Sequence, residues 1–530
     1  MVLNRFNILK IAVNPYLLLL YLSLGQAFIL LRIDLAFWYK VLAAISGFAF
    51  YYLLIQISEK LFKLFLTISL VFSFFIFPAE HVYGFPDKNM ISSVLYTNAG
   101  EAWSYIKIVP VTYYLILLFV FLYTLVLLFS HFKKVRNSYL TVSALLIVLA
   151  PVATYIFYHN ESSFFDTDNR QLNIRYTYVP VIKIPLLIAI EGYQVMRVNH
   201  QIIEESRMPD NWEILNKNSL SLKKNIVIVI GESVRKDYMN CYGFPIDNTI
   251  FINSTPHFQF ENCISSGAYT VPVLTRTLVY SNPFPQFNPA DNIVNLVKKA
   301  GYKTYWFSNQ GYIGIYDSPV SMIAEGCDHY FKYNGGDFHT AKLDTKMLPG
   351  ISQVIKNDTN SKVIFVHMIG SHPGVTDRTL GKYDQFVLSK EISCYIQSIK
   401  NTDSFLSAIY EDLKQTNKSF GLIYFSDHGL KLNNSGEFVH SYETKETHDV
   451  PLLVWGNNIE TSTYFKAFRN TNQFLELFCE LYDIRTSNIK PAYKFISEDD
   501  ADSSVFEALG EGSQVLDYRK FKRNPVPTLK

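Results

Sequence analysis

The chain has 530 residues, a formal net charge of +2, and a composition that is 49% hydrophobic and 18% charged. This length exceeds one ordinary hydrophobic core, so two or more domains are expected. A nearly neutral chain without a basic stripe gives no case for nucleic-acid binding. The five cysteines are scattered and odd in number, so at least one is unpaired within the chain, and the sequence gives no disulfide connectivity.

The sequence predicts a membrane domain over residues 1–160. They contain five apolar stretches, and each offers about the 20 apolar residues that a helix needs to cross a bilayer. The first stretch is not a cleaved signal peptide, because no small-residue cleavage site follows it and further stretches do. We therefore expect five transmembrane helices, over residues 14–33, 36–57, 61–79, 108–131 and 138–158.

Basic residues in the short connections predict the orientation of these spans. They occur at the N-terminus, after the second span and after the fourth span, which alternate onto one side of the membrane. The positive-inside rule makes that side cytoplasmic. The outer loop 80–106 and everything after residue 158 then lie in the periplasm or outside the cell, where one or two disulfides are compatible with the redox environment.

Residues 161–220 form a bridge between the two halves. A polar segment is followed by the apolar but short stretch VPVIKIPLLIAIEGYQVMRV, which Pro185 interrupts. We expect a helix lying in the membrane interface rather than a sixth span. The distinction matters, because a sixth span would place the remaining residues in the cytoplasm.

Residues 221–530 alternate short apolar runs with amphipathic segments. The run NIVIVIG is β-branched and continuous, as is typical of a buried parallel strand. Similar runs are KTYWFS, KVIFVH, FGLIYFS and DVPLLVW, and helical patterns lie between them, one of them ending at Gly301. This alternation predicts an α/β domain with a mostly parallel central sheet and helices on both faces.

Candidate metal ligands follow two of these strands directly. Glu232 ends the first, and the Asp427-His428-Gly429 tripeptide ends another. Taken alone, Glu232 is a helix-terminus acid, and the tripeptide is a surface aspartate beside a capping histidine. Taken together, they meet at the carboxyl ends of strands, where open α/β sheets bind ligands. A carboxylate beside an imidazole suits zinc, so a zinc site is predicted.

Thr270 is the candidate nucleophile near this site. It precedes Val271-Pro272 and therefore stands where a helix begins, so one interpretation is a simple N-cap. The other is a hydroxyl that a helix N-terminus and a zinc ion activate as an alkoxide nucleophile. Ser265, Ser266 and Thr275 are competing hydroxyls, and His372 and His440 are expected near the site.

These motifs resemble the membrane phosphoethanolamine transferases of Gram-negative envelopes, which belong to the alkaline phosphatase and sulfatase superfamily. IGESVRKDYMNCYGFPIDNT is similar to the family's first metal motif, TVPVLTR to its nucleophile segment, and FSDHG to its second metal motif. The resemblance implies an alkaline phosphatase/sulfatase-like periplasmic domain. It also implies that Thr270 is the nucleophile and that the firm zinc site is held by Glu232, Thr270, Asp427 and His428.

The resemblance extends to residues that bind substrate. The outer loop DKNMISSVLYTNAGEAWSY is similar to the family loop that binds the donor headgroup, and the histidines are similar to its phosphate-binding or second-zinc residues. The substrate-binding residues implied are Ser93, Thr97, Glu101, Asn309, His372 and His440. Ser93, Gly311 and Gly314 depart from the branch that modifies lipid A, so the chain looks closer to the branch acting on lipopolysaccharide core or other acceptors.

The implied reaction takes phosphoethanolamine from phosphatidylethanolamine and gives it to an envelope acceptor, the lipopolysaccharide core or lipid A, at the inner membrane. One alternative is a glycerol-phosphate transferase resembling lipoteichoic acid synthases. Another is a sulfatase or phosphodiesterase, although the Cys/Ser-x-Pro-x-Arg context of sulfatases is absent around Thr270. A non-catalytic sensor or assembly factor is a third. The acceptor, a second zinc, and the oligomeric state stay open.

Overall fold

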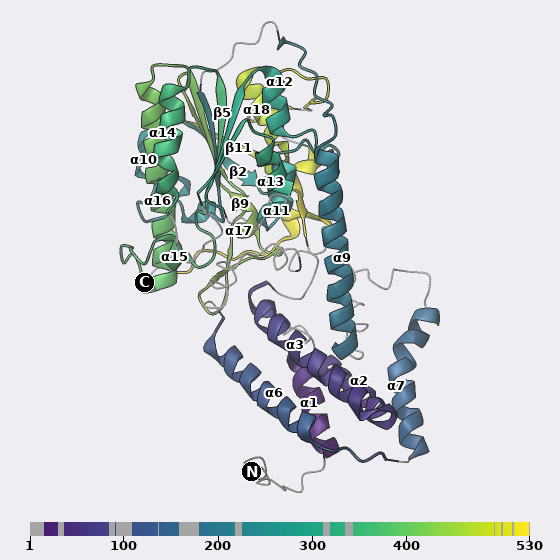
Figure 1. Cartoon of the computed structure of the whole chain (residues 1–530). Helices are drawn as coiled ribbons and strands as arrows, with labels where there is room; N and C mark the ends of the chain where they lie inside the picture. Colours follow the sequence, from purple (N-terminus) through teal and green to yellow (C-terminus); the bar gives the residue numbers. More distant parts are fainter. Residues whose placement is uncertain are drawn as a thin grey trace, which may run out of the picture. The chain divides into compact units, whose positions relative to one another are not determined.

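The computed structural model describes residues 15–29, 37–83, 91, 109–135, 137–157, 180–217, 225–310, 319–333, 343–491, 493–499, 502–510 and 514–528. These residues form two compact units, one containing those up to Gln194 and the other those from Val195 onward (Figure 1). Each unit is described by itself below. The predicted domain limits 1–160, 161–220 and 221–530 stay predictions.

The first unit consists of apolar helices. Helix α1 packs on α2, α2 on α7, and α3 on α6. Helix α9 begins in this unit and continues into the second. The helices span α1 Pro15–Ile29, α2 Phe37–Ile57, α3 Glu59–Tyr83, α6 Val111–Phe129, α7 Ser138–Phe157 and α9 Pro180–Ser206.

Three of these helices are long and apolar enough to cross a membrane, judged by length and composition over the described residues. The qualifying stretches are Lys40–Ile57, Glu59–Pro78 and Val111–Phe129. Helices α1 and α7 contain the shorter apolar stretches Tyr16–Ala27 and Ser138–Leu149. The predicted membrane-type helical half is therefore confirmed, with a helix at each of the five predicted places, while the number of spans stays a prediction.

A buried polar triad fastens three helices of this unit. The side-chain nitrogen Nε2 of Gln26 on α1 donates to the Ser69 hydroxyl on α3 at 2.7 Å. The Tyr51 hydroxyl on α2 donates to the side-chain oxygen Oε1 of Gln26 at 3.0 Å. All three side chains are buried. Because apolar side chains give little preference among helix pairings in lipid, such hydrogen bonds fix which helices meet.

Helix α9 corrects one detail of the prediction. The sequence suggests an interruption at Pro185, yet the helix runs without a break from Pro180 to Ser206. A proline removes one intrahelical N–H bond, and here that loss falls near the helix start, so the long remainder still propagates. The predicted interfacial position of this helix stays a prediction.

The second unit contains the central sheet, whose strand order is β11-β2-β10-β6-β1-β5-β3-β4, with β9 paired to β2. The pairs β6-β1, β1-β5, β5-β3, β3-β4 and β2-β11 are parallel, while β10 runs against β6 and β2. The predicted mostly parallel sheet is confirmed. The strands span β1 Asn225–Gly231, β2 Phe258–Ile264, β3 Lys303–Ser308, β4 His329–Lys332, β5 Lys362–His367, β6 Phe420–Ser426, β9 Asp449–Val450, β10 Leu452–Gly456 and β11 Thr463–Asn470.

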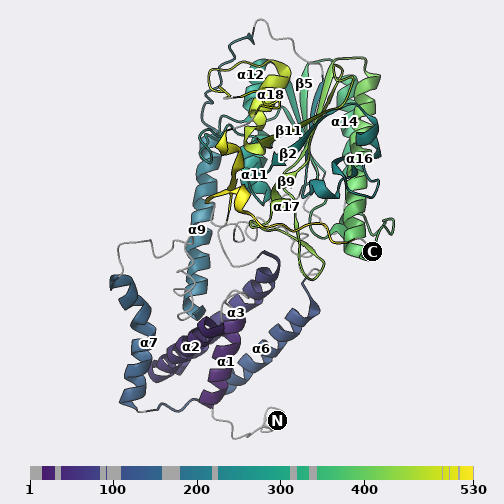
Figure 2. The same ribbon diagram turned by 180° about the vertical axis from the view of Figure 1, so that it is seen from behind.

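Helices cover both faces of this sheet, and two hydrophobic cores result. Ile226, Ile228 and Ile230 of β1 face one core, while Val227 and Val229 face the other, as the twofold alternation of a strand requires. Figures 1 and 2 show one helical layer on each face. The first layer contains α11 Thr270–Thr277, α12 Ile293–Ala300, α13 Pro319–Glu325 and α18 Phe474–Tyr482, and the second α10 Ile250–Ser254, α14 Leu348–Asn357 and α16 Lys390–Gln415.

No disulfide joins the five cysteines, all of which are free thiols in described parts of the chain. Cys263 and Cys479 belong to one core and Cys394 to the opposite one, so the sheet separates them. Burial raises the pKa of the Cys263 thiol to about 12, which suppresses the reactive thiolate. The one or two disulfides that the predicted compartment would allow are therefore not formed between these cysteines.

Gly370 brings the segment after β5 against the segment after β1. Its φ is +47°, and a Cβ atom placed on it would lie 2.9 Å from the backbone oxygen of Glu232. The next residue, Ser371, donates its backbone N–H to that same oxygen at 3.0 Å. This close approach requires glycine for two reasons, the left-handed conformation and the lack of space.

We expect Gly370→Ala to lower the free energy of unfolding of this unit by more than Gly436→Ala does. Gly436 also has a left-handed φ of +82°, but nothing lies within 4 Å of its Cβ position. The control therefore isolates the conformational cost of about 1–2 kcal/mol. Denaturant unfolding followed by tryptophan fluorescence measures both, and equal losses would contradict the steric argument.

Candidate active site and metal centre

The register of β1 and β6 creates the site. The two strands are parallel, and Gly231 pairs with Ser426 at their carboxyl ends. The next residue on each strand is a carboxylate, Glu232 on one and Asp427 on the other, and both are fully buried. Neighbouring strands lie about 4.8 Å apart, so this register alone makes the two acids neighbours.

Ser233 turns the chain immediately after Glu232 and ties the two acids together. It adopts a left-handed φ of 61°, which is uncommon for a residue other than glycine. Its backbone N–H donates to Asp427 Oδ1 at 3.0 Å, and its hydroxyl donates to Glu232 Oε1 at 2.6 Å. These bonds compensate a backbone conformation that costs on the order of 1–3 kcal/mol.

His428 points its Nε2 atom at both carboxylates. Nε2 lies 3.3 Å from Asp427 Oδ2 and 3.6 Å from Glu232 Oε1. The other ring nitrogen, Nδ1, lies 2.8 Å from the carbonyl oxygen of Gly429 and must donate to it. A neutral imidazole with its proton on Nδ1 presents a lone pair at Nε2, which is the arrangement of a metal-binding histidine.

Thr270 brings a hydroxyl into this cluster. Its Oγ1 donates to Glu232 Oε2 at 3.2 Å and lies 3.4 Å from His428 Nε2. Thr270 is the first residue of helix α11, and Tyr269, which precedes it, makes no side-chain capping bond. The simple N-cap interpretation therefore does not describe Thr270, whose hydroxyl faces the acids.

The competing hydroxyls are placed elsewhere. Ser265 Oγ donates to the carbonyl oxygens of Asp427 and Gly267, and Thr275 Oγ1 donates to the carbonyl of Val271 within its own helix. Ser266 is fully buried; its backbone carbonyl accepts the N–H of Leu509, and its backbone N–H donates to the Thr471 hydroxyl. Of the four candidates, Thr270 is the one whose hydroxyl contacts Glu232 and His428.

The arrangement fits a metal ion. One ligand atom each of Glu232, Asp427 and His428 lies within 4.8 Å of the other two, and all three residues are buried. Asp427 Oδ2 has no hydrogen-bond partner among the described residues. Two carboxylates and an imidazole lone pair converging in a buried site repel one another unless a cation lies between them. Mixed oxygen and nitrogen ligands suit zinc.

The pKa of Glu232 reflects the same repulsion between the two buried carboxylates. Burial, and then the negative charge of Asp427, raise the pKa of the Glu232 carboxyl well above its usual value, and the donors Ser233 and Thr270 only partly oppose this. A carboxyl that resists ionisation in the bare protein is one whose charged form a bound cation stabilises.

His372 and His440 lie beside the cluster. The ring of His440 is 5.0 Å from that of His428 and 6.3 Å from that of His372, and the Tyr269 ring stacks on His440 at 4.7 Å. Burial lowers the pKa of His372 to about 3, helped by Arg378, whose Nη2 is 3.5 Å from its Nδ1. Burial and the neighbouring His428 also lower the pKa of His440. Both rings are therefore neutral at neutral pH.

Asn309 lies at the end of β3 and is fully buried. Its amide nitrogen donates to Asp344 Oδ1 at 2.9 Å, and Asp344 also accepts the backbone N–H groups of Ile369 and Gly370 at 3.0 and 3.1 Å. Its predicted substrate contact stays a prediction. Ser93, Thr97 and Glu101, predicted to contact the donor, lie outside the described residues.

Sequence reasoning missed one side chain that touches the site. Gln310 follows Asn309 after β3, and its Nε2 donates to Glu232 Oε2 at 3.1 Å. An uncharged amide carries no signature of metal or acid–base chemistry. The available signal was positional, because Gln310 follows a strand end as Glu232 and Asp427 do.

We expect Asp427→Asn to weaken zinc binding by more than the roughly 10–100-fold typical of outer-shell partners, since the amide keeps the shape but removes the charge. The zinc-free protein should gain thermal stability, because the repulsion with Glu232 disappears. Asp403→Asn is the matched control: Asp403 is also a buried acid, and it accepts the backbone N–H groups of Phe251 and Ile252. Equilibrium dialysis with zinc analysis measures both, and wild-type affinity in Asp427→Asn would contradict the assignment.

Two family models match the chain. The model described as phosphoethanolamine transferase EptA/EptB matches residues 45–188, and the model described as sulfatase matches residues 224–484. The first covers most of the helical unit. The second covers the central sheet, Glu232, Thr270, Asp427 and His428.

Curated relatives extend the match over both units. The phosphoethanolamine transferase OpgE of Escherichia coli is 30% identical over 479 residues, which is 89% of each chain. A putative phosphoethanolamine transferase of Haemophilus influenzae is 37% identical over 247 residues, 43% of this chain and 50% of its own.

Solved structures share the fold. The lipooligosaccharide phosphoethanolamine transferase A of Neisseria meningitidis, an integral membrane protein, matches with a TM-score of 0.60 and 17% identity over 88% of this chain and 95% of its own. The zinc complex of the periplasmic domain of EptC from Escherichia coli matches with a TM-score of 0.50 and 20% identity over 59% of this chain and 97% of its own. With OpgE similar along nearly its whole length, the chain belongs to the phosphoethanolamine transferase family of the alkaline phosphatase superfamily.

Proposed function

We propose that this enzyme transfers phosphoethanolamine from phosphatidylethanolamine to an envelope acceptor, the lipopolysaccharide core or lipid A, through a covalent intermediate on Thr270. The observation that carries the proposal is the position of the Thr270 hydroxyl, 3.2 Å from Glu232 Oε2 and 3.4 Å from His428 Nε2. A hydroxyl pointed at a buried metal-type cluster from the start of a helix is arranged for nucleophilic attack.

The proposed centre holds one zinc through Glu232, Asp427, His428 and Thr270. Zinc bound there would lower the pKa of the Thr270 hydroxyl and offset the negative charge of the phosphoryl group. The chain contributes the geometry: the β1–β6 register sets the acids, Gly429 fixes the imidazole tautomer, and Ser265 ties the nucleophile segment to the Asp427 backbone.

Two displacements at phosphorus complete the transfer. In the first, a bond forms between Thr270 Oγ1 and phosphorus while the bond to the diacylglycerol oxygen breaks, and diacylglycerol leaves with a proton. In the second, an acceptor oxygen forms its bond to phosphorus, the threonine–phosphorus bond breaks, and Thr270 recovers a proton. Dividing the transfer in this way is ordinary covalent catalysis.

His372 and His440 are proposed to bind the transferred group, with a second zinc at these rings as the open alternative. Because the pKa of each is lowered, both rings stay neutral, and a neutral imidazole offers one N–H to a phosphoryl oxygen or one lone pair to a metal. The Nδ1 atom of His372 also lies 3.2 Å from the carbonyl oxygen of Pro373. Arg378 beside His372 adds positive charge next to that position. Ser93, Thr97, Glu101 and Asn309 complete the predicted contacts with substrate.

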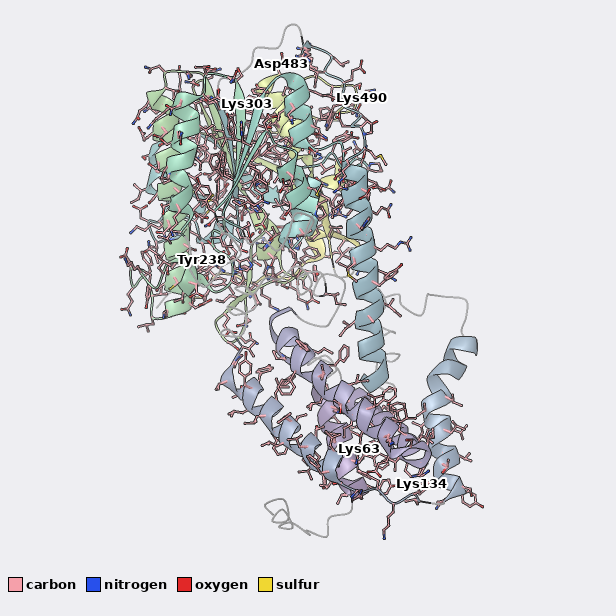
Figure 3. All side chains as sticks on the ribbon, viewed as in Figure 1. Lys63, Lys134, Tyr238, Lys303, Asp483 and Lys490 are labelled. Atoms are coloured by element: carbon pink, nitrogen blue, oxygen red, sulfur yellow. The ribbon has the colours of Figure 1, made fainter. Side chains whose placement is uncertain are left out.

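The proposed orientation has the N-terminus in the cytoplasm, five spans in the inner membrane, and the catalytic unit in the periplasm. Contacts inside the helical unit support it. The Tyr16 hydroxyl donates to the carbonyl of Lys133, and Lys134 Nζ donates to the carbonyl of Ile57 at 3.4 Å. Lys63 and Lys134 are labelled in Figure 3. The start of α1 and the two basic connections therefore meet on one side, as the positive-inside rule requires.

The covalent intermediate is tested by intact-mass analysis of the full chain after incubation with phosphatidylethanolamine. We expect a phosphoethanolamine adduct on the wild type and none on Thr270→Ala. Thr275→Ala is the matched control, because it removes a hydroxyl from the same helix that bonds only to the Val271 carbonyl. It should form the adduct normally.

Two outcomes would contradict the proposal. An adduct on Thr270→Ala would place the nucleophile elsewhere. No adduct on folded, zinc-loaded wild type would exclude phosphatidylethanolamine as the donor of a covalent intermediate, and phosphatidylglycerol would be tested next as the glycerol-phosphate alternative.

The orientation is tested by labelling introduced cysteines with a membrane-impermeant maleimide. Leu388→Cys, at a residue of the catalytic unit that is 80% exposed, should label in intact spheroplasts. Lys134→Cys, in the connection after α6, should label only after permeabilisation. The native thiols Cys263, Cys394 and Cys479 are buried, but Cys241 and Cys327 are only half-buried, so the chain without an introduced cysteine is the control for background labelling. Labelling of Lys134→Cys in intact spheroplasts would reverse the proposed topology.

A further inference from the structure

Gln310 connects three neighbouring strand ends. It follows β3, and its Nε2 donates both to the carbonyl oxygen of Met368, just after β5, and to Oε2 of Glu232, just after β1. The distances are 2.5 Å and 3.1 Å. Its own backbone N–H is held by the Ser308 hydroxyl at 3.2 Å, so the side chain starts from a fixed point.

The chemistry of the two neighbours determines how the amide is oriented. A carboxylate and a backbone carbonyl are both acceptors, so the end of the Gln310 side chain that faces them must be the nitrogen, with its two hydrogens. The oxygen that accepts from Gln310 is also the oxygen that accepts from Thr270. Gln310 and the candidate nucleophile therefore share one atom of Glu232.

The same strand end also controls the backbone of Glu232. Asn309 donates to Asp344, which accepts the backbone N–H of Gly370, and Gly370 lies against the Glu232 backbone. Asn309 thus acts on the main chain of Glu232 through two intermediates, whereas Gln310 acts directly on the side chain. Only the second connection sets the rotation of the carboxylate.

We propose that Gln310 is a positioning residue of the metal centre, which holds the Glu232 carboxylate so that Oε1 faces His428 and Oε2 faces Thr270. This inference deepens the proposed function and rests on it for the role of Thr270. Without the amide, Oε2 loses a donor that a part-buried site does not readily replace, and the Ser233 hydroxyl on Oε1 and the Thr270 hydroxyl on Oε2 are left as the donors that restrain the carboxylate. Both the hold on a cation and the placement of Thr270 then weaken.

The test uses the full chain with Gln310→Met, which keeps the length and removes the donors, and Gln310→Glu, which places a second carboxylate beside Glu232. The matched control is Gln259→Met. Gln259 Nε2 also donates to a backbone carbonyl, that of Cys241 at 2.9 Å, and to a glutamate, Glu261 at 2.7 Å, but on strand β2. The control removes the same pair of donated bonds, together with a contact between Gln259 Oε1 and His257 Nε2 at 3.1 Å, without touching the metal cluster.

Zinc retention during dialysis against a graded chelator series is the primary measurement, and circular dichroism and thermal unfolding establish folding. We expect Gln310→Met to bind zinc roughly 10–100-fold more weakly than the wild type, as for other outer-shell partners. Gln310→Glu should be weaker still, and Gln259→Met unchanged. In the adduct assay, excess zinc should restore part of the rate to Gln310→Met, with KM for phosphatidylethanolamine nearly unchanged.

Wild-type zinc affinity in folded Gln310→Met would overturn the inference, and a rise in KM with intact zinc affinity would make Gln310 a substrate contact instead. Failure of the proposed function is distinguishable. If the wild type forms no adduct but zinc retention still falls on removal of the Gln310 amide, the positioning role stands and the transfer mechanism does not. If Gln310→Met does not fold, the folded Gln310→Glu protein decides by the same zinc measurement.

Discussion

The pairing of β1 with β6 places two fully buried carboxylates side by side. Gly231 and Ser426 are in register, so the chain delivers Glu232 and Asp427 to adjacent positions, and His428 adds a lone pair aimed at both. Burial makes this arrangement unfavourable by itself, as the raised pKa of Glu232 shows. A cation bound between these groups would remove the repulsion, so the sheet register that sets the two acids also creates the proposed metal centre.

Much of the surrounding structure serves to hold that cluster still. Ser233 adopts a left-handed backbone conformation to reach both acids, Gly370 allows the β5 end to touch the Glu232 backbone, and Gln310 restrains its carboxylate. None of these residues carries the chemistry. Each occupies the turn after a parallel strand, where main-chain direction changes and side chains from neighbouring strands converge. This explains why the candidate site lies at one edge of the sheet.

The fold and the clustering of the candidate ligands were both predictable from the sequence. Apolar β-branched runs predict the parallel strands, and Glu232, Asp427 and His428 are residue types that metals commonly bind, each placed directly after a strand. Gln310 and Asp344 are not, because their roles arise only when β3 and β5 lie beside β1. Local pattern also misled at Pro185, where the predicted interruption is a continuous helix. No sequence signal shows that the sheet keeps Cys263 and Cys394 on opposite faces.

We propose that a single zinc ion is bound at the ends of β1 and β6 by oxygen atoms and one imidazole. X-ray absorption at the zinc edge, on the full chain loaded with one equivalent of zinc, identifies the atoms that bind the metal. We expect oxygen and nitrogen neighbours with the multiple-scattering signature of one histidine, and the loss of that signature in His428→Ala. A sulfur ligand, or two or more imidazoles at one equivalent, would contradict it and move the principal metal site to the cysteines or to His372 and His440.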